Sequence, residues 1–176
     1  MALPEPAVTL ALLLLLLASA ALTDAAAATR WYRAETELTV EQSGPWPGFA
    51  RLPAEARESV RPEVWAQSTT SAGVVVLFEQ HGRSCTELLI NASLTSAALD
   101  MPHMPATGVS GFDLYAWDEL EVHGYRWAAG WTPPWGQQTG AVGTLASGLS
   151  PTLQRFALYL PLYNGQKTLS FRTLYT

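Results

Sequence analysis

Apolar and polar side chains alternate along residues 112–117, and this alternation limits the chain to a β-type fold in that region. Phe112, Leu114 and Ala116 would face one way, and Asp113, Tyr115 and Trp117 the other. A period of two residues is that of a half-buried β-strand. Residues 156–160 alternate in the same way until Pro161, which cannot donate a backbone N–H and so ends the strand.

The Asn164-Gly165 pair predicts a hairpin turn. Both residues tolerate positive φ, which a type I′ turn requires twice, so we expect a hairpin into a strand over residues 168–172. Further strands are expected at residues 36–40, 73–78, 86–93, 125–130 and 139–145, together with a strand that holds Trp65. Residues 54–60 could form one or two helical turns after Pro53.

Short strands with Gly and Pro between them indicate an all-β, antiparallel sandwich of about eight strands. A chain of 176 residues is long enough for one well-buried core, so one folded domain over residues 28–176 is expected. The two prolines of residues 101–105 predict an extended, unpaired connector into the strand at 112–117.

The N-terminal residues 1–27 have the pattern of a secretory signal peptide. Val8–Leu17 is almost purely apolar, and Ala18-Ser19-Ala20 is a small-residue cleavage site. Secretion or another extracytoplasmic location follows. An uncleaved signal anchor stays open, and membrane association is expected only in that case. No Lys or Arg precedes the apolar run, which is atypical of both a signal peptide and a signal anchor. The formal net charge of −5 gives no electrostatic reason to bind nucleic acid.

Cysteine and histidine give no sign of a metal centre. Cys85 is the only cysteine, and we interpret it as a small core residue. The three histidines are scattered, so neither a metal site nor a cofactor is predicted, although calcium at the acidic residues 113–121 stays open. Asn91-Ala92-Ser93 is an N-glycosylation sequon, which makes Asn91 a candidate modification site in a eukaryotic secretory pathway.

Two features could bind a ligand. Asp is disfavoured inside a strand, so Asp113 either accepts hydrogen bonds from backbone N–H groups or from Arg51 or Arg126, or contacts a ligand on a sandwich face; we favour the first reading. Trp131 and Trp135 lie in a Pro-rich loop, where aromatic faces could stack on sugar rings. Anchoring of that loop by burial is the alternative.

Several motifs in register resemble those of the N-terminal domain that precedes bacterial SGNH-hydrolase-type esterases. Gly111, Asp113, Leu114 and Tyr115 match its G-x-D-L-Y signature. The other matching segments, in the same order, are Arg51-Leu52-Pro53, Val64-Trp65, Ser71-Ala72-Gly73, Met101-Pro102-His103-Met104-Pro105 and Leu160-Pro161-Leu162-Tyr163-Asn164-Gly165. The resemblance covers roughly residues 49–174.

This resemblance implies a jelly-roll sandwich that packs on a separate hydrolase domain, in cis or in trans. Those hydrolase domains carry a Gly-Asp-Ser nucleophile motif, which does not occur in this sequence. We therefore expect an accessory domain that helps shape a substrate site, with an acylated carbohydrate as the expected substrate. Whether the chain is itself an enzyme stays open.

Two rival functions are weighed against the accessory role. One is a free-standing carbohydrate-binding domain that uses Trp131 and Trp135. The other is a small complete esterase, with Asp100 and His103 at the Asp-x-x-His spacing of a catalytic acid and base. A triad also needs an activated serine and an oxyanion hole, which this segment does not supply, so we interpret His103 as part of a stiff connector or as a ligand contact.

Overall fold

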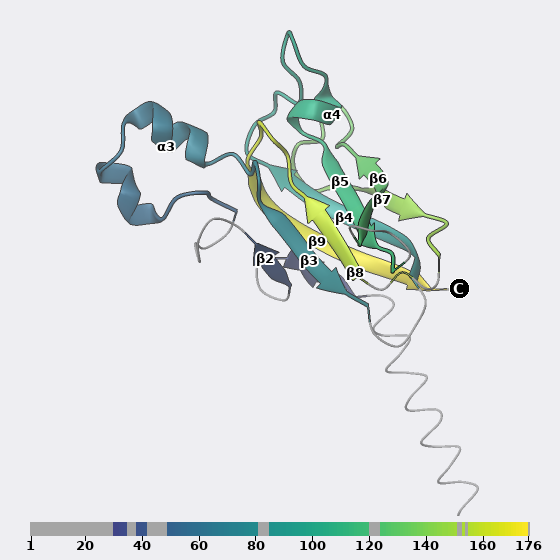
Figure 1. Cartoon of the computed structure of the whole chain (residues 1–176). Helices are drawn as coiled ribbons and strands as arrows, with labels where there is room; N and C mark the ends of the chain where they lie inside the picture. Colours follow the sequence, from purple (N-terminus) through teal and green to yellow (C-terminus); the bar gives the residue numbers. More distant parts are fainter. Residues whose placement is uncertain are drawn as a thin grey trace, which may run out of the picture. The chain divides into compact units, whose positions relative to one another are not determined.

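A computed structural model of the chain describes residues 30–34, 38–41, 49–80, 85–119, 124–150, 153 and 155–175 (Figure 1). Almost all of these belong to a unit that runs from Trp31 to Thr176. The expected signal segment, residues 1–27, lies outside the described residues. So do Trp46, His81, Glu121 and His123.

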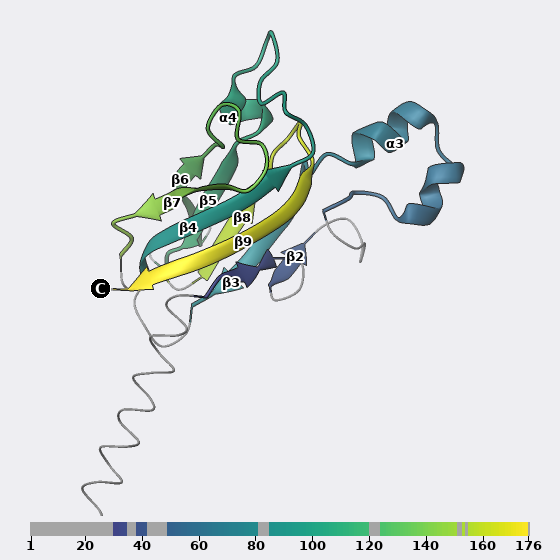
Figure 2. The same ribbon diagram turned by 180° about the vertical axis from the view of Figure 1, so that it is seen from behind.

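The described strands form two antiparallel sheets (Figures 1 and 2). Sheet A has the order β1 (Tyr32–Arg33), β9 (Gln166–Tyr175), β4 (Cys85–Leu94), β7 (Ala141–Ser147). Sheet B has the order β2 (Thr39–Glu41), β3 (Val75–Glu79), β8 (Arg155–Tyr159), β5 (Phe112–Trp117), β6 (Tyr125–Trp131). The prediction of an antiparallel β-sandwich is confirmed.

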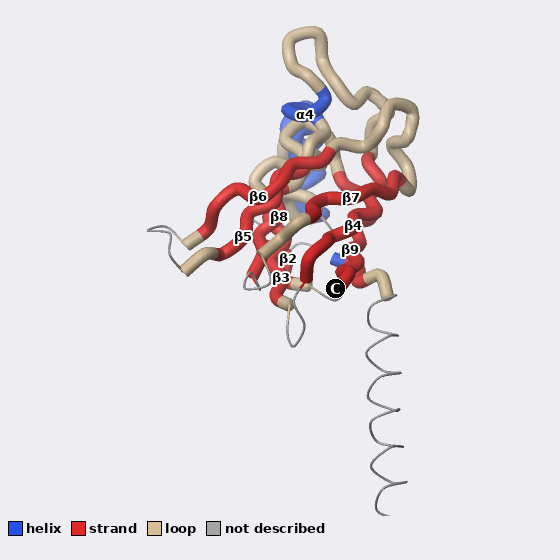
Figure 3. Tube along the Cα trace, turned by 90° about the vertical axis from the view of Figure 1, so that its right-hand side faces the viewer, coloured by secondary structure: helices blue, strands red, loops and turns tan. Residues whose placement is uncertain are grey.

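The core lies between the two sheets, which Figure 3 shows as two layers of strands. The predicted inward side chains of β5 and β8 are buried, among them Phe112, Leu114 and Leu158. Phe78 bridges the layers, because its ring stacks 5.2 Å from Phe156 of sheet B and 5.1 Å from Phe171 of sheet A. Apolar burial of this kind contributes roughly 25 cal/mol per Å² removed from water. Burial of the inward-facing apolar side chains therefore holds the two sheets together.

The segment between β2 and β3 is helical. The 3₁₀ helix η1 (Ala54–Glu58) follows Pro53 as predicted, and α3 (Pro62–Ser68) comes next. The prediction of a strand around Trp65 was therefore wrong. Pro62 is pre-organised for the first helical turn and cannot donate to a ladder, and Glu63 is favourable near a helix N-terminus. The backbone N–H of Arg51 donates to the carbonyl of Ser68 at 2.9 Å, and this bond joins the two ends of the segment that holds η1 and α3.

Residues 101–105 are not an unpaired connector. Met101 and Met104 each donate a backbone N–H to the other's carbonyl at 3.0 Å, which makes a tight turn with Pro102 and His103 at its tip. Proline presets φ for the second position of such a turn, so Pro102 promotes the pairing. The short helix α4 (Ala106–Val109) follows directly.

The predicted hairpin at Asn164-Gly165 is also wrong. Neither residue has positive φ, and β8 and β9 lie in different sheets, so this connection crosses from sheet B to sheet A. The two residues are instead buried at the end of the sandwich. Gly165 is needed for close approach, because a Cβ there would lie 2.4 Å from the carbonyl oxygen of Thr69.

The carboxamide of Asn164, 1% exposed, joins three segments that are far apart in the sequence. Its Oδ1 accepts from the Ser96 backbone N–H at 3.0 Å and from the Thr95 hydroxyl at 3.3 Å. Its Nδ2 donates to the Ser96 carbonyl at 3.2 Å and to the Ser110 hydroxyl at 3.0 Å. The Asn164 carbonyl accepts from both the N–H and the hydroxyl of Ser71, at 3.2 and 3.0 Å.

Replacing Asn164 should destabilise the fold more than replacing its exposed neighbour. Asn164→Ala leaves several buried partners without a hydrogen bond, each costing about 1–3 kcal/mol, so a loss of about 3 kcal/mol or more is expected in urea unfolding. Tyr163→Ala is the control, since that side chain is 47% exposed. Equal unfolding midpoints for the two variants would contradict this role of the carboxamide.

Candidate functional site

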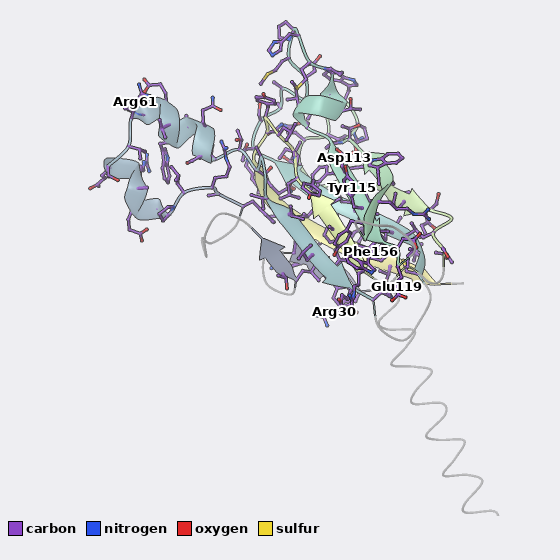
Figure 4. All side chains as sticks on the ribbon, in the orientation of Figure 1. Arg30, Arg61, Asp113, Tyr115, Glu119 and Phe156 are labelled. Carbon is purple, nitrogen blue, oxygen red and sulfur yellow. The ribbon has the colours of Figure 1, made fainter. Side chains whose placement is uncertain are left out.

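The structure divides the G-x-D-L-Y signature into residues that build the fold and residues that face solvent. Leu114 is fully buried in the core. Gly111 allows α4 to approach β5, because a Cβ there would lie 2.1 Å from the carbonyl oxygen of Thr107. Asp113 and Tyr115 are on the opposite side of β5 from Leu114, on the outer surface of sheet B (Figure 4). The fold therefore accounts for Gly111 and Leu114 but not for Asp113.

Asp113 is exposed, and its partner is not the one predicted. Its Oδ1 accepts a hydrogen bond from the indole Nε1–H of Trp127 at 3.1 Å. Arg51 instead donates to the Gln67 carbonyl and to the Thr70 hydroxyl, and Arg126 forms an ion pair with Asp118 at 3.4 Å. The interpretation that Asp113 locks two loops through an arginine was wrong, because both arginines serve other segments.

Aromatic side chains surround Asp113 on the outer surface of sheet B. Tyr159 is opposite Asp113 on β8, and Trp127 is opposite Tyr115 on β6. The rings of Tyr115 and Tyr159 pack edge to face at 5.3 Å, and those of Trp117 and Tyr125 at 5.1 Å. We call this surface the aromatic face; its residues are Asp113, Tyr115, Trp117, Tyr125, Trp127 and Tyr159.

Several of these rings remain open to solvent. Trp127 is 59% exposed and Tyr159 is 46% exposed. Contiguous apolar surface of this kind commonly marks an interaction site on a soluble protein. Sequence reasoning did not identify Trp127 or Tyr159 as site residues. The alternation of their strands could have shown that both side chains point outward. Their position around Asp113 depends on the pairing between strands, which the sequence of a single strand does not give.

The two tryptophans predicted to bind sugar have different environments. Trp131 is partly buried and packs on Phe112 with ring centroids 5.6 Å apart. Its Nε1 lies 2.4 Å from the position that a Cβ on Gly143 would occupy, so it fills the space between β6 and β7. Trp135 is 68% exposed in the following loop. Trp131 is thus held between strands while Trp135 is open to solvent, and sugar binding by this pair stays a prediction.

A second group of exposed residues lies on the connections at one end of the sandwich. Leu162 is 51% exposed and Tyr163 is 47% exposed. The Tyr163 backbone N–H donates to the Val109 carbonyl of α4 at 3.1 Å, which ties this loop to the segment that carries the exposed His103. We call His103, Leu162 and Tyr163 the loop end.

The remaining predicted residues are placed as follows. Cys85 is fully buried, which confirms its interpretation as a core residue. Asn91 is partly exposed on β4, opposite Val142 and Ser170, and its glycosylation stays a prediction. A hollow of about 500 Å³ beside α3 is lined by residues that include Arg51, Glu63 and Val64, far from the signature in sequence.

The described part of the chain contains no cluster of three or more His, Cys, Asp or Glu side chains that could hold a metal ion. Within the same residues, none of the helices has the length and apolarity needed to cross a bilayer.

The fold and its surface define a β-sandwich module with exposed aromatic and acidic side chains on the outer surface of one sheet. The match of residues 29–172 to a family model then identifies it: the chain belongs to the GxDLY family, described as the N-terminus of SGNH-hydrolase-type esterases. The resemblance drawn from the sequence motifs is thereby confirmed. None of the curated proteins matches the chain.

A solved structure shares the fold. It is the crystal structure of a provisionally assigned GDSL-like lipase from Bacteroides ovatus, with a TM-score of 0.67 and 20% sequence identity. The match covers 81% of this chain and 40% of the Bacteroides chain. This chain therefore corresponds to less than half of that protein.

Two signature residues should respond differently to substitution. Gly111→Ala should lower the free energy of unfolding by about 2 kcal/mol or more, because its Cβ overlaps backbone atoms that cannot move freely. Asp113→Ala should stay within about 0.5 kcal/mol of the wild type, because the carboxylate is at the surface. Thermal and urea unfolding of the purified variants measure both, and a large loss for Asp113→Ala would assign that residue to the fold instead.

Burial should make stability depend on pH through Cys85. Loss of hydration raises the pKa of its thiol from 9.0 to about 11. The folded state therefore favours the neutral thiol, and this contribution is fully present below about pH 9 and lost as the pH rises through about 11. The loss should be about 2–3 kcal/mol. Unfolding free energies of wild type and Cys85→Ala, compared from pH 8 to 11, should converge as the pH rises; parallel curves would contradict the prediction.

Proposed function

We propose that this domain is a non-catalytic accessory module that packs on an SGNH-type hydrolase domain and helps shape its substrate site, with an acylated carbohydrate as the substrate class. One observation carries the proposal. Motif residues of an esterase-associated family that the fold does not require, Asp113 and Tyr163, are left at the surface, where only a second molecule or domain can use them. The 60% of the Bacteroides chain outside the match is room for such a domain.

The loop end is the surface we assign to the hydrolase domain. Its exposed residues are a leucine, a tyrosine and a histidine, a mixture that suits the apolar centre of a protein interface. It is also held in place from below, since Asn164 and Ser110 are buried in the hydrogen-bond network directly beneath it. A preorganised surface loses less conformational entropy when it binds.

Two further parts of the proposal concern architecture and location. The sandwich is of the jelly-roll type: the orders β1-β9-β4-β7 and β3-β8-β5-β6 interleave strands of two Greek keys, and β2 is an added edge strand. Export through the signal-like residues 1–27 would bring the domain to extracytoplasmic substrates. The apolar run and its small-residue exit support this location.

Capture of the hydrolase tests the accessory role. The tagged chain is incubated with an extract of its source organism, and retained proteins are labelled with a fluorescent fluorophosphonate, which reacts with activated serines. We expect a labelled protein that sequencing shows to carry a Gly-Asp-Ser motif. The double variant Leu162→Ala, Tyr163→Ala should retain at least about tenfold less of it, as expected when central interface residues are truncated.

Val142→Ala is the matched control, because Val142 is 52% exposed on β7 of sheet A and is not part of the loop end. It should retain the hydrolase as the wild type does. No labelled hydrolase on the wild type would refute a hydrolase partner in trans, and equal retention by the loop-end variant would refute the assignment of the loop end to the hydrolase. Ester turnover by the purified chain alone would favour the small-esterase alternative instead.

A further inference from the structure

We propose that the aromatic face of sheet B is a binding site for a neutral oligosaccharide, centred on Asp113 and Trp127. This inference deepens the proposed function and rests on it for the link to an esterase, since the site would hold the sugar part of an acylated substrate. The binding itself needs only this chain, so it can be tested without the hydrolase.

Trp127 supplies the apolar platform. Its Nε1–H donates to Asp113, and its Cζ2 lies 3.7 Å from the position of a Cβ on Gly130, so the edge of the indole lies beside Gly130. With 59% of the residue exposed, much of the ring surface is open. The C–H groups on one face of a pyranose carry partial positive charge, which matches the negative face of an aromatic ring.

Asp113 supplies the polar half of the site. An ionised carboxylate can accept about four hydrogen bonds, and the contact from Trp127 occupies one of its oxygens. Hydroxyl groups on the rim of a sugar that lies on Trp127 would reach the second oxygen. Bonds from hydroxyl groups to a charged carboxylate are shorter and stronger than neutral ones, so Asp113 would orient the sugar.

Gly130 and Tyr159 define the extent of the site. The cross-strand row Tyr159, Asp113, Gly130 spans two strand spacings, about 10 Å. Gly130 leaves the surface beside Asp113 open, and Tyr159, 46% exposed, borders it on the β8 side. Figure 4 shows Asp113 and Tyr115 near each other on β5.

A glycan fits this chemistry better than the other occupants of a sheet face. A lipid surface would bury the Asp113 carboxylate with no basic group to balance its charge, which is costly. A protein interface, including one with a second copy of this chain, would desolvate the same charge unless it brought a basic group to it. A glycan offers hydroxyl donors on its rim and leaves the site hydrated, and water-mediated contacts keep such sites favourable.

Isothermal titration with neutral hexasaccharides tests the site. Cello-, xylo-, manno- and chitohexaose and an acetylated xylo-oligosaccharide are each titrated into the full chain, and we expect saturable binding of at least one. Trp127→Ala should weaken it about tenfold or more, and Trp127→Phe less, because a ring remains. Gly130→Leu should abolish binding while the fold is kept, since the nearest atoms to a Cβ at Gly130 are at 3.4 Å and its φ is not positive.

Trp135→Ala is the matched control, an equally exposed tryptophan outside the aromatic face, and it should bind as the wild type does. Circular dichroism checks that each variant is folded. The inference is overturned if no oligosaccharide binds, if Trp127→Ala and Gly130→Leu both bind normally, or if only Trp135→Ala loses binding. It is also overturned if Trp127→Ala dissociates a dimer in sedimentation, or abolishes hydrolase capture while no sugar binds; in that last case the accessory role stands.

Discussion

The rest of the structure depends on the buried carboxamide of Asn164, because it joins segments that apolar burial alone would not hold in register. Two sheets that pack through Phe78 and its neighbours could slide, since hydrophobic contact is not directional. The bonds that the carboxamide forms with Ser96 and Ser110, and those that Ser71 donates to the Asn164 backbone carbonyl, are directional, and they fix the connections at one end of the sandwich. The turn that carries His103, the helix α4 and the crossing into β9 all lead from this network. The exposed residues of the loop end are therefore placed by groups that never reach the surface.

This arrangement explains why motif segments that are distant in the sequence lie together in the fold. Ser71-Ala72-Gly73 and Leu160–Gly165 meet where the Ser71 hydroxyl donates to the carbonyls of Pro161 and Asn164, both at 3.0 Å. Gly111 admits α4 beside β5, and Gly165 admits Thr69 and Thr95 beside β9. Such residues are constrained by the space and the hydrogen bonds around them. The motif residues that the fold does not require are at the surface, among them Asp113 and Tyr163, and the proposed function is argued from these.

Local pattern predicted the strands well and the connections poorly. Alternation along residues 112–117 and 156–160 correctly gave the inward side chains, because the period of a strand depends only on its own sequence. It did not give the burial of Ala157, which it placed on the outward side and which is 4% exposed. Asn164-Gly165 was misread because turn propensity is local, whereas the carboxamide of Asn164 is bonded to residues up to 69 positions away. A strand was expected at Trp65, but a helix that begins at Pro62 includes this residue. The partner of Asp113 could not be derived, since a bulge between Leu114 and Tyr115 sets which β6 residue lies beside it.

Strand β5 shows how one segment can serve both the fold and recognition. Its inward residues are required by the core, so they position the outward residues without cost to stability. Asp113 is therefore free to keep an unfilled acceptor and Trp127 to keep an open ring, features that a core would not tolerate. The aromatic face is on the outer surface of a sheet, whereas the loop end is formed by the connections between strands. Because the two surfaces use different residues, the proposed sugar chain and the proposed hydrolase domain would not compete for the same side chains.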